Sequence, residues 1–185
     1  GGNHVQVGFP VPGDVDPAHW NPGIADITAF QKADLILLNG AGYAKWVRKV
    51  SLPRSKMVDT SKKFKNQYIY AKNVVTHSHG GEGQHAHEAL AFTTWLNFEL
   101  AAGQAQAIAA ALGRKRPELK DKFQGNSNLL VGELKALDRE IEKITSQSQS
   151  TPLIVSHPVY DYFTQRYGLN IISLHWEPAE IPTQQ

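Results

Sequence analysis

Apolar and polar residues follow two different periods along this chain, and the two periods alternate. The segment from His4 to Phe9 alternates polar and apolar residues, as a half-buried strand does. From Asp26 to Ala33 the apolar residues recur at helical spacing, and the run Leu35 to Leu38 then predicts a buried strand that Asn39-Gly40 ends. Strands and helices that alternate in this way favour an α/β fold with largely parallel sheets.

The second half of the chain continues the alternation with longer helices. A polar connection with a short strand at Tyr68 to Tyr70 precedes Thr94 to Leu112, whose Ala-, Gln- and Leu-rich composition predicts a helix ended by Gly113. Between Ser127 and Thr145, Leu and Ile recur every three or four positions with charged residues between them, which predicts a long amphipathic helix. We then expect a strand, a short helix and another strand, at Pro152 to Ser156, Asp161 to Tyr167 and Leu169 to Leu174.

A chain of this length can form one core, or two small lobes that share an interface. We divide it into residues 1–124, with a histidine-rich loop at 76–88, the long helix within residues 125–147, and residues 148–185. Only about 38 residues make up the last part, which is too few to close an independent core. Either this part docks on the first, or the chain is a fragment.

Composition excludes several classes of function. Lys and Arg number 19 against 17 Asp and Glu, and no dense basic cluster occurs, so nucleic acid is not an expected partner. No apolar stretch approaches the roughly 18 residues of a membrane span, and no signal peptide stands at Gly1, so a signal would already have been removed from an exported chain. Because the chain has no cysteine, any metal must be bound by imidazole, carboxylate or water.

Histidines supply the clearest chemical pattern. Four of the eight lie within eleven residues, as two His-x-His pairs separated by a glycine-rich stretch: His77, His79, His85 and His87. Imidazole suits zinc, copper, nickel and cobalt, and glycines let such a segment bend around one ion. A solvated loop that binds metals loosely would have the same composition.

Two further histidines lie where a ligand could be presented accurately. His19 follows Asp14-Val15-Asp16-Pro17 in a loop restricted by prolines, and a packing role beside Trp20 is the alternative. His157 directly follows the expected strand at Pro152 to Ser156, and ligands of open α/β sheets bind outside the carboxyl ends of the strands. A histidine that merely caps the sheet would occupy the same place.

Three longer motifs follow one another along nearly the whole chain. The first is Pro12-Gly13-Asp14-x-Asp16-Pro17-x-His19-x-Asn21-Pro22, followed by Gln31 to Gly42. The second is Trp95-Leu96-Asn97 with Ala101 to Ile108, and the third is Val155 to Leu169. In this order they resemble the periplasmic solute-binding proteins that serve zinc- and manganese-importing ABC transporters, and the chain looks like a zinc-type member truncated at both ends.

The resemblance implies two small α/β lobes with parallel sheets, joined by a long bridging helix within residues 125–147, with the second lobe incomplete. It also implies that the metal lies between the lobes, bound by His19 of the first lobe and His157 of the second. Such proteins usually place another histidine two residues before the tryptophan of the second motif, where this chain has Thr93. The expected substitute is His85 or His87, with His87 favoured and His79 still open. The usual carboxylate ligand would lie beyond Gln185, which leaves Glu88 and Glu177 as weak replacements.

We therefore interpret the chain as a non-enzymatic, periplasmic or otherwise extracytoplasmic zinc receptor of an ABC importer, with the permease as its partner and manganese as the less favoured metal. A metal-buffering or interaction fragment is the first alternative. A zinc hydrolase with Glu88 or Glu82 as general base is less favoured, because no His-Glu-x-x-His signature occurs. Apolar surface on an incomplete second lobe would also favour a homo-oligomer.

Overall fold

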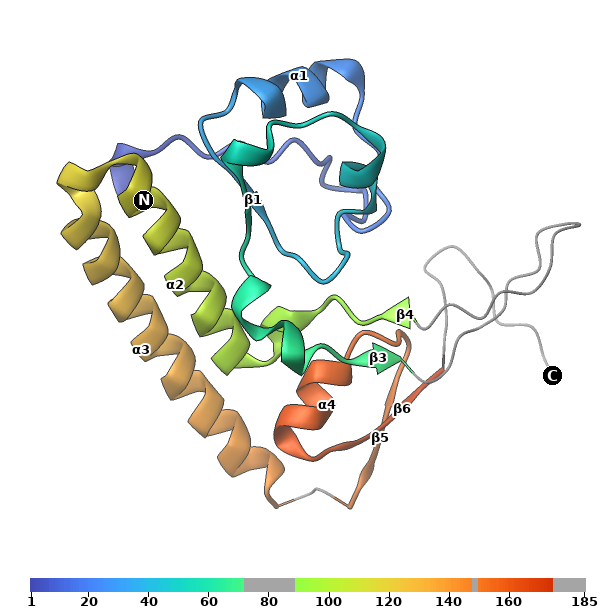
Figure 1. The fold of residues 1–185 in the computed structure, drawn as a ribbon. Helices are drawn as coiled ribbons and strands as arrows, with labels where there is room; N and C mark the ends of the chain where they lie inside the picture. Colours follow the sequence, from blue (N-terminus) through green and yellow to red (C-terminus); the bar gives the residue numbers. More distant parts are fainter. Residues whose placement is uncertain (72–88, 148–149, 175–185) are drawn as a thin grey trace, which may run out of the picture.

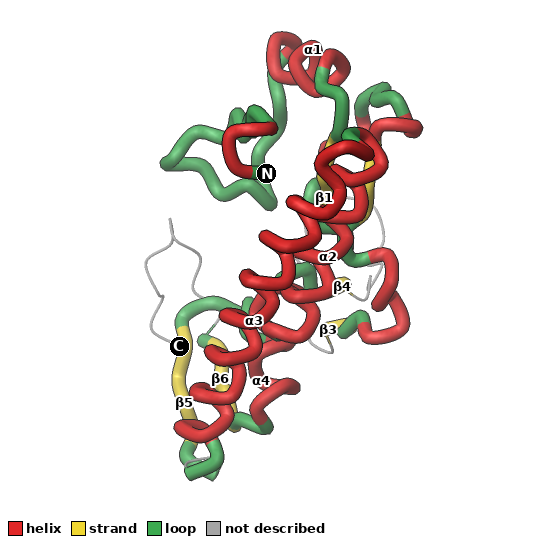
Figure 2. The backbone as a smooth tube through the Cα atoms, turned by 90° about the vertical axis from the view of Figure 1, so that its left-hand side faces the viewer, coloured by secondary structure: helices red, strands yellow, loops and turns green. Residues whose placement is uncertain are grey.

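Two long antiparallel helices form the spine of the molecule, with the other elements on one side of them (Figure 1). The computed structural model describes residues 1–71, 89–147 and 150–174. Helix α2 (Phe98–Lys115) and helix α3 (Lys120–Thr145) are joined by a 3-10 turn at Pro117–Leu119. Figure 2 shows the two helices side by side, with β5, α4 and β6 at the C-terminal end of α3.

Helix α2 is the helix predicted from Thr94, but its ends differ. Residues Thr94–Leu96 form a 3-10 turn, and the α-helix begins after Asn97, whose side-chain oxygen accepts the backbone N–H of Glu99 at 3.0 Å. Gly113 was expected to end the helix and does not. It is buried inside the last turns, where a Cβ would lie 3.1 Å from Cγ of Lys120, so glycine here serves the close approach of α3.

Helix α3 confirms the long amphipathic helix and begins earlier than predicted, at Lys120. Its buried side chains follow the spacing of four to seven residues that a helical face requires: Phe123, Ser127, Val131 and Asp138. The predicted apolar stripe is only partly covered, since Leu137 is 42% exposed and Ile144 is 68% exposed. The helix therefore packs on α2 through a face rotated from the one that the leucine pattern indicated.

The first lobe holds helix α1 (Ile24–Lys32) and two parallel strands, β1 (Ile36–Leu38) and β2 (Met57–Asp59), which pair residue by residue from Ile36 with Met57. Helix α1 and strand β1 confirm the prediction. The sequence did not predict β2, because its three residues are too few to show a period of two.

The strand expected at His4 to Phe9 is absent, and this prediction is wrong. The segment runs as irregular chain, with Val7 83% exposed and Phe9 70% exposed. An alternating pattern makes a strand only when a neighbour takes up its backbone hydrogen bonds, and no segment in the described part of the chain pairs with it.

The second lobe holds strand β5 (Pro152–Val155), helix α4 (Asp161–Tyr167) and strand β6 (Asn170–Ser173), as predicted. The two strands are parallel. Gly168 ends α4 in the left-handed conformation at φ 63°, which glycine adopts without a steric penalty.

A small antiparallel pair, β3 (Tyr70–Ala71) with β4 (Ala89–Leu90), lies between the lobes (Figure 1). The short strand expected at Tyr68 to Tyr70 is present only from Tyr70, and it extends to Ala71. The histidine-rich loop predicted at 76–88 falls between these strands, and it lies outside the described residues.

The two lobes share a core, so the second lobe docks on the first. Phe64, Leu100 and Tyr162 form a buried cluster, and Tyr162 of α4 has no exposed surface. Burial of one such aromatic side chain stabilises the fold by about 2–3 kcal/mol. The α/β fold with parallel sheets and a long helix is confirmed, while the division at residues 124 and 147 stays a prediction. None of the described helices is long and apolar enough to cross a membrane.

Candidate metal centre

The loop that carries His19 is fixed by its neighbours, while the histidine side chain itself faces solvent. Ala18 is 3% exposed and Trp20 is 9% exposed, whereas the His19 side chain is 67% exposed. Trp20 packs edge-on against Trp46 with ring centroids 5.7 Å apart, and Phe30 of α1 completes the aromatic cluster. The packing role proposed for this loop thus belongs to Trp20, and His19 is left available for a ligand.

Asp16 orients the His19 ring. One carboxylate oxygen of Asp16 accepts the backbone N–H of Ala18 at 2.8 Å, and the other lies 3.3 Å from Nδ1 of His19. Because a carboxylate can only accept, Nδ1 carries the proton and Nε2 keeps its lone pair. A carboxylate behind the imidazole is the usual support of a metal-binding histidine.

His157 lies in the loop between β5 and α4, at the carboxyl end of the parallel pair, and its side chain is half-buried. Its Nδ1 is 2.8 Å from Oγ of Ser156. The serine hydroxyl can either donate to or accept from Nδ1, so this contact orients the ring without fixing which ring nitrogen carries the proton. The position outside the strand end is as predicted.

A short segment, Phe92 and Thr93, contacts the His157 loop and Tyr43. Thr93 donates its hydroxyl hydrogen to the carbonyl of Val159 at 2.6 Å, and the Phe92 ring packs on the Tyr43 ring at 5.1 Å. Burial and, as the smaller cause, the charge of Asp16 raise the pKa of Tyr43. The His157 loop is therefore bonded to this segment, whereas the His19 loop acts on Tyr43 only through the charge of Asp16.

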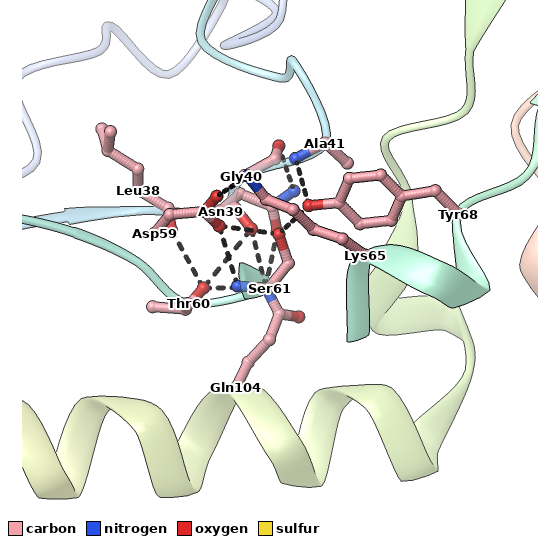
Figure 3. A network of polar contacts seen from close by, with 10 residues as sticks. All are labelled: Leu38, Asn39, Gly40, Ala41, Asp59, Thr60, Ser61, Lys65, Tyr68 and Gln104. Carbon is pink, nitrogen blue, oxygen red and sulfur yellow. Dashed lines mark hydrogen bonds and ion pairs between the residues drawn. The ribbon is translucent and has the colours of Figure 1, made fainter. Parts of the chain in front are cut away.

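That segment is bonded through Asn39 to a buried polar network, which Figure 3 shows. Asn39, just after β1, donates to the carbonyl of Phe92 at 3.0 Å, and Gln104 of α2 donates to the Asn39 side chain at 3.0 Å and to the Thr60 hydroxyl at 3.0 Å. Thr60 and Gln104 are buried. These side chains fill their hydrogen bonds with one another, so the network supports the segment and offers no free ligand.

The described residues include only part of the predicted ligand set. His19 and His157 are described, whereas His77, His79, His85 and His87 lie outside the described residues, as do Glu82, Glu88 and Glu177. Within residues 1–71, 89–147 and 150–174, no three His, Asp or Glu side chains come together as a metal site. Coordination by the predicted set therefore stays a prediction.

Asp16, Ser156, Tyr43 and Thr93 take part in this region, and the sequence reasoning gave none of them a role there. The Asp16-to-His19 spacing of three residues in a turn could have indicated the first contact. The bond between Thr93 and Val159 joins residues 66 positions apart, and no local pattern marks it. The threonine stands where the family resemblance implied a histidine, and its hydroxyl is used for a bond between the lobes.

Comparison with known proteins gives a consistent result. A family model described as the zinc-uptake complex component A, periplasmic, matches residues 1–185. The high-affinity zinc uptake system protein ZnuA of Bacillus subtilis is 26% identical over 175 residues, which cover 89% of this chain and 52% of that protein. The manganese ABC transporter substrate-binding lipoprotein scaA of Streptococcus gordonii is 30% identical over 174 residues, covering 91% of this chain and 54% of the relative.

The fold is similar to that of solved members. A crystal structure of ZnuA superposes with a TM-score of 0.76 at 25% identity, covering 94% of this chain and 63% of the other. The chain spans about half the length of the curated relatives it matches, 52% and 54%. These relatives are named as metal-uptake and substrate-binding proteins, and neither name is that of an enzyme.

Proposed function

Since the chain belongs to the ZnuA family of periplasmic zinc-uptake components, we propose that it is an extracytoplasmic zinc receptor that delivers its metal to the permease of an ABC importer. Histidines from both lobes bind the ion between them. His19 comes from the first lobe and His157 from the second, and a histidine of the 77–87 segment, with His87 favoured, is the third ligand.

One observation carries the proposal: the loop that bears His157 is bonded to the chain segment that packs on Tyr43. Thr93 of that segment donates to the carbonyl of Val159, two residues from His157, and the preceding Phe92 packs on the Tyr43 ring. The charge of Asp16, beside His19, acts on Tyr43 from the first lobe. At His19 the Asp16 carboxylate engages Nδ1 and leaves Nε2 to a ligand.

The third ligand is proposed from the segment between strands β3 and β4. These strands lie between the lobes and flank the part of the chain that contains His77, His79, His85 and His87 (Figure 1). Glycines in the segment permit the bend that convergence requires.

Zinc is favoured over manganese by the chemistry of this ligand set. Three neutral imidazoles match the nitrogen ligands and fourfold coordination of zinc, and the remaining position would be filled by water or by a carboxylate. Manganese prefers oxygen donors, whereas three of the four proposed ligands are imidazole nitrogens. Proteins named for zinc and for manganese both occur among the relatives, so metal identity is decided by measurement.

A metal-buffering fragment is the second candidate, and the concentration of four histidines within residues 77–87 favours it. In that case the segment would bind metal by itself, and loss of His19 or His157 would leave affinity unchanged. The two candidates therefore differ in which histidines the metal needs.

Calorimetric titration with zinc separates them. We expect one tight site in the parent chain, weakened at least about 100-fold by His19→Ala, by His157→Ala and by joint replacement of the four segment histidines with Asn, because each change removes a ligand. His4→Ala is the matched control, since His4 lies in the first turn of the chain outside the proposed site. Binding that only the fourfold replacement abolishes would establish the buffer instead.

A further inference from the structure

Thr93 is buried between the lobes, three residues after the end of β4. It is 6% exposed, and its hydroxyl bonds the Val159 carbonyl at 2.6 Å, a short distance for such a bond. Val159 belongs to the β5–α4 loop, two residues beyond His157. The bond thus fixes the middle of the loop that carries the second-lobe histidine.

The anchor is itself rigid. Phe92, before Thr93, is held by the Asn39 side chain through its carbonyl and by the Tyr43 ring. Thr94, after it, has no exposed surface, and its hydroxyl bonds Gln104 of α2 at 3.3 Å. Because the residues on both sides of Thr93 are fixed, its hydroxyl can hold the β5–α4 loop at a fixed position relative to the first lobe.

Tyr162 supplies a second bond across the same contact. Its buried hydroxyl accepts the backbone N–H of Ile69 at 3.2 Å and donates to the carbonyl of Ala91 at 3.3 Å. Ile69 and Ala91 face each other just beyond the β3–β4 pair, where Ala91 also donates to Ile69 at 2.9 Å. The start of α4 is therefore fastened to the base of the β3–β4 pair, and Thr93 fastens the loop that precedes it.

We propose that Thr93 is a positioning residue for the metal site: its hydroxyl holds the β5–α4 loop, and with it His157, in register with the first lobe. This inference rests on the proposed function. The second lobe then meets the first with His157 already in place, so that little ordering is left for metal binding to accomplish. Removing the hydroxyl leaves His157 present but its loop free to move.

The test compares Thr93→Val, which keeps the shape and removes the hydroxyl, with Thr93→Ser, which keeps the hydroxyl. Thr145→Val is the matched control, because the Thr145 hydroxyl also bonds a backbone carbonyl, that of Ile141 at 2.8 Å, but within α3. We expect zinc affinity to fall about tenfold in Thr93→Val and to stay within about twofold of the parent in Thr93→Ser and Thr145→Val. The cobalt-loaded protein should show an altered visible absorption spectrum in Thr93→Val alone.

A double-mutant cycle separates positioning from general stability. If Thr93 acts through His157, the Thr93→Val change should alter affinity less than about twofold in a His157→Ala background. An equal loss in both backgrounds, or full affinity in Thr93→Val, would overturn the proposal. Thr93→Ala replaces Thr93→Val in the same comparison if the valine variant does not fold.

Hydrogen exchange of the metal-free protein tests whether Thr93 holds the β5–α4 loop, independently of zinc binding. Thr93→Val should speed amide exchange at residues 155–161 and leave the middle of α2 unchanged. Unchanged exchange in the loop would refute the positioning role whatever the metal does. Faster exchange in the loop, together with a parent chain that has no tight zinc site, would retain the lobe contact and refute the receptor.

Discussion

Asp16 is the residue on which the chemistry of His19 depends. In Asp16→Asn the amide oxygen can still accept from Ala18, but the amide nitrogen then faces Nδ1 of His19 and donates to it. The proton moves to Nε2, which removes the lone pair that would bind the metal. We expect zinc affinity to fall about 10- to 100-fold, as measured by competition with a chelating dye.

The matched control for Asp16 is Asp14→Asn, an exposed aspartate in the same loop. It should leave affinity unchanged. Both variants should unfold within about 0.5 kcal/mol of the parent, because both side chains lie at the surface. Equal affinities for the two variants would mean that Asp16 does not orient a ligand.

Asp138 connects the bridging helix to the second lobe through a charge that the fold buries. Its carboxylate is bonded by two guanidinium nitrogens of Arg166 and by the Tyr167 hydroxyl, and the Arg166 hydrogen bond lowers the pKa of Asp138. We expect Asp138→Asn to cost about 3 kcal/mol of unfolding free energy at pH 7, since it leaves Arg166 without its buried partner. Asp121→Asn, in the exposed first turn of α3, is the control.

The same pair gives a pH dependence. Because the folded pKa of Asp138 is below the unfolded value of about 3.9, its stabilisation is present above that value and is lost as the pH falls through the folded pKa. Urea unfolding should therefore show the parent and Asp138→Asn converging below about pH 4. A constant difference at every pH would show that the pair is not the source of the effect.

Local motifs identified two candidate ligands, His19 and His157, but not the residues that hold the lobes together around them. His19 and His157 stand beside turn formers and at a strand end, which the sequence displays. Thr93 and Tyr162 act on backbone atoms 66 and 93 positions away, so only the folded chain reveals them.

The turn after β1 is the element most sensitive to one added carbon atom. Gly40 has φ 82°, and a Cβ there would lie 1.8 Å from the Ser61 hydroxyl and 2.1 Å from an Asp59 oxygen, inside the network of Figure 3. We expect Gly40→Ala to cost about 3 kcal/mol or more in thermal or urea unfolding, through both strain and the clash.

Gly42 provides the comparison within the same turn. Its φ is 73°, but nothing lies within 4 Å of an added Cβ, so Gly42→Ala should cost only the backbone strain of about 1–2 kcal/mol. Similar losses for the two variants would mean that the buried network relaxes around Gly40.

At this scale the sequence predicted most helices and strands because each shows its own period over enough residues. The predictions failed where a neighbouring segment decides whether a strand forms or which face of a helix is buried. His4 to Phe9 has the alternation of a strand and no described neighbour to pair with, whereas β2 has a neighbour and too short a pattern. The leucine stripe of α3 likewise indicated a helix correctly, but the buried face was set by α2.

Apolar side chains of β5 and β6 are exposed on the surface of the second lobe. Ile154 of β5 is 68% exposed and Ile172 of β6 is 48% exposed. We predict that this surface mediates self-association, which sedimentation velocity over a concentration series would detect. Ile154→Lys should weaken the association about tenfold or more, since burial of one isoleucine is worth about 1.5–3 kcal/mol.

Ile24→Lys is the control for this surface, because Ile24 is 85% exposed but belongs to α1 in the first lobe. It should leave the association unchanged. A parent chain that stays monomeric at every concentration would contradict the prediction, and equal effects of the two lysines would show that the contact is not specific to the second lobe.

In the proposed receptor, one zinc ion lies between the lobes, bound by a histidine from each. Anomalous diffraction at the zinc absorption edge, from crystals grown with one equivalent of zinc, tests it directly. We predict one strong peak about 2.0–2.1 Å from Nε2 of both His19 and His157. A peak coordinated only by histidines of residues 77–87, with neither His19 nor His157 in contact, would contradict it.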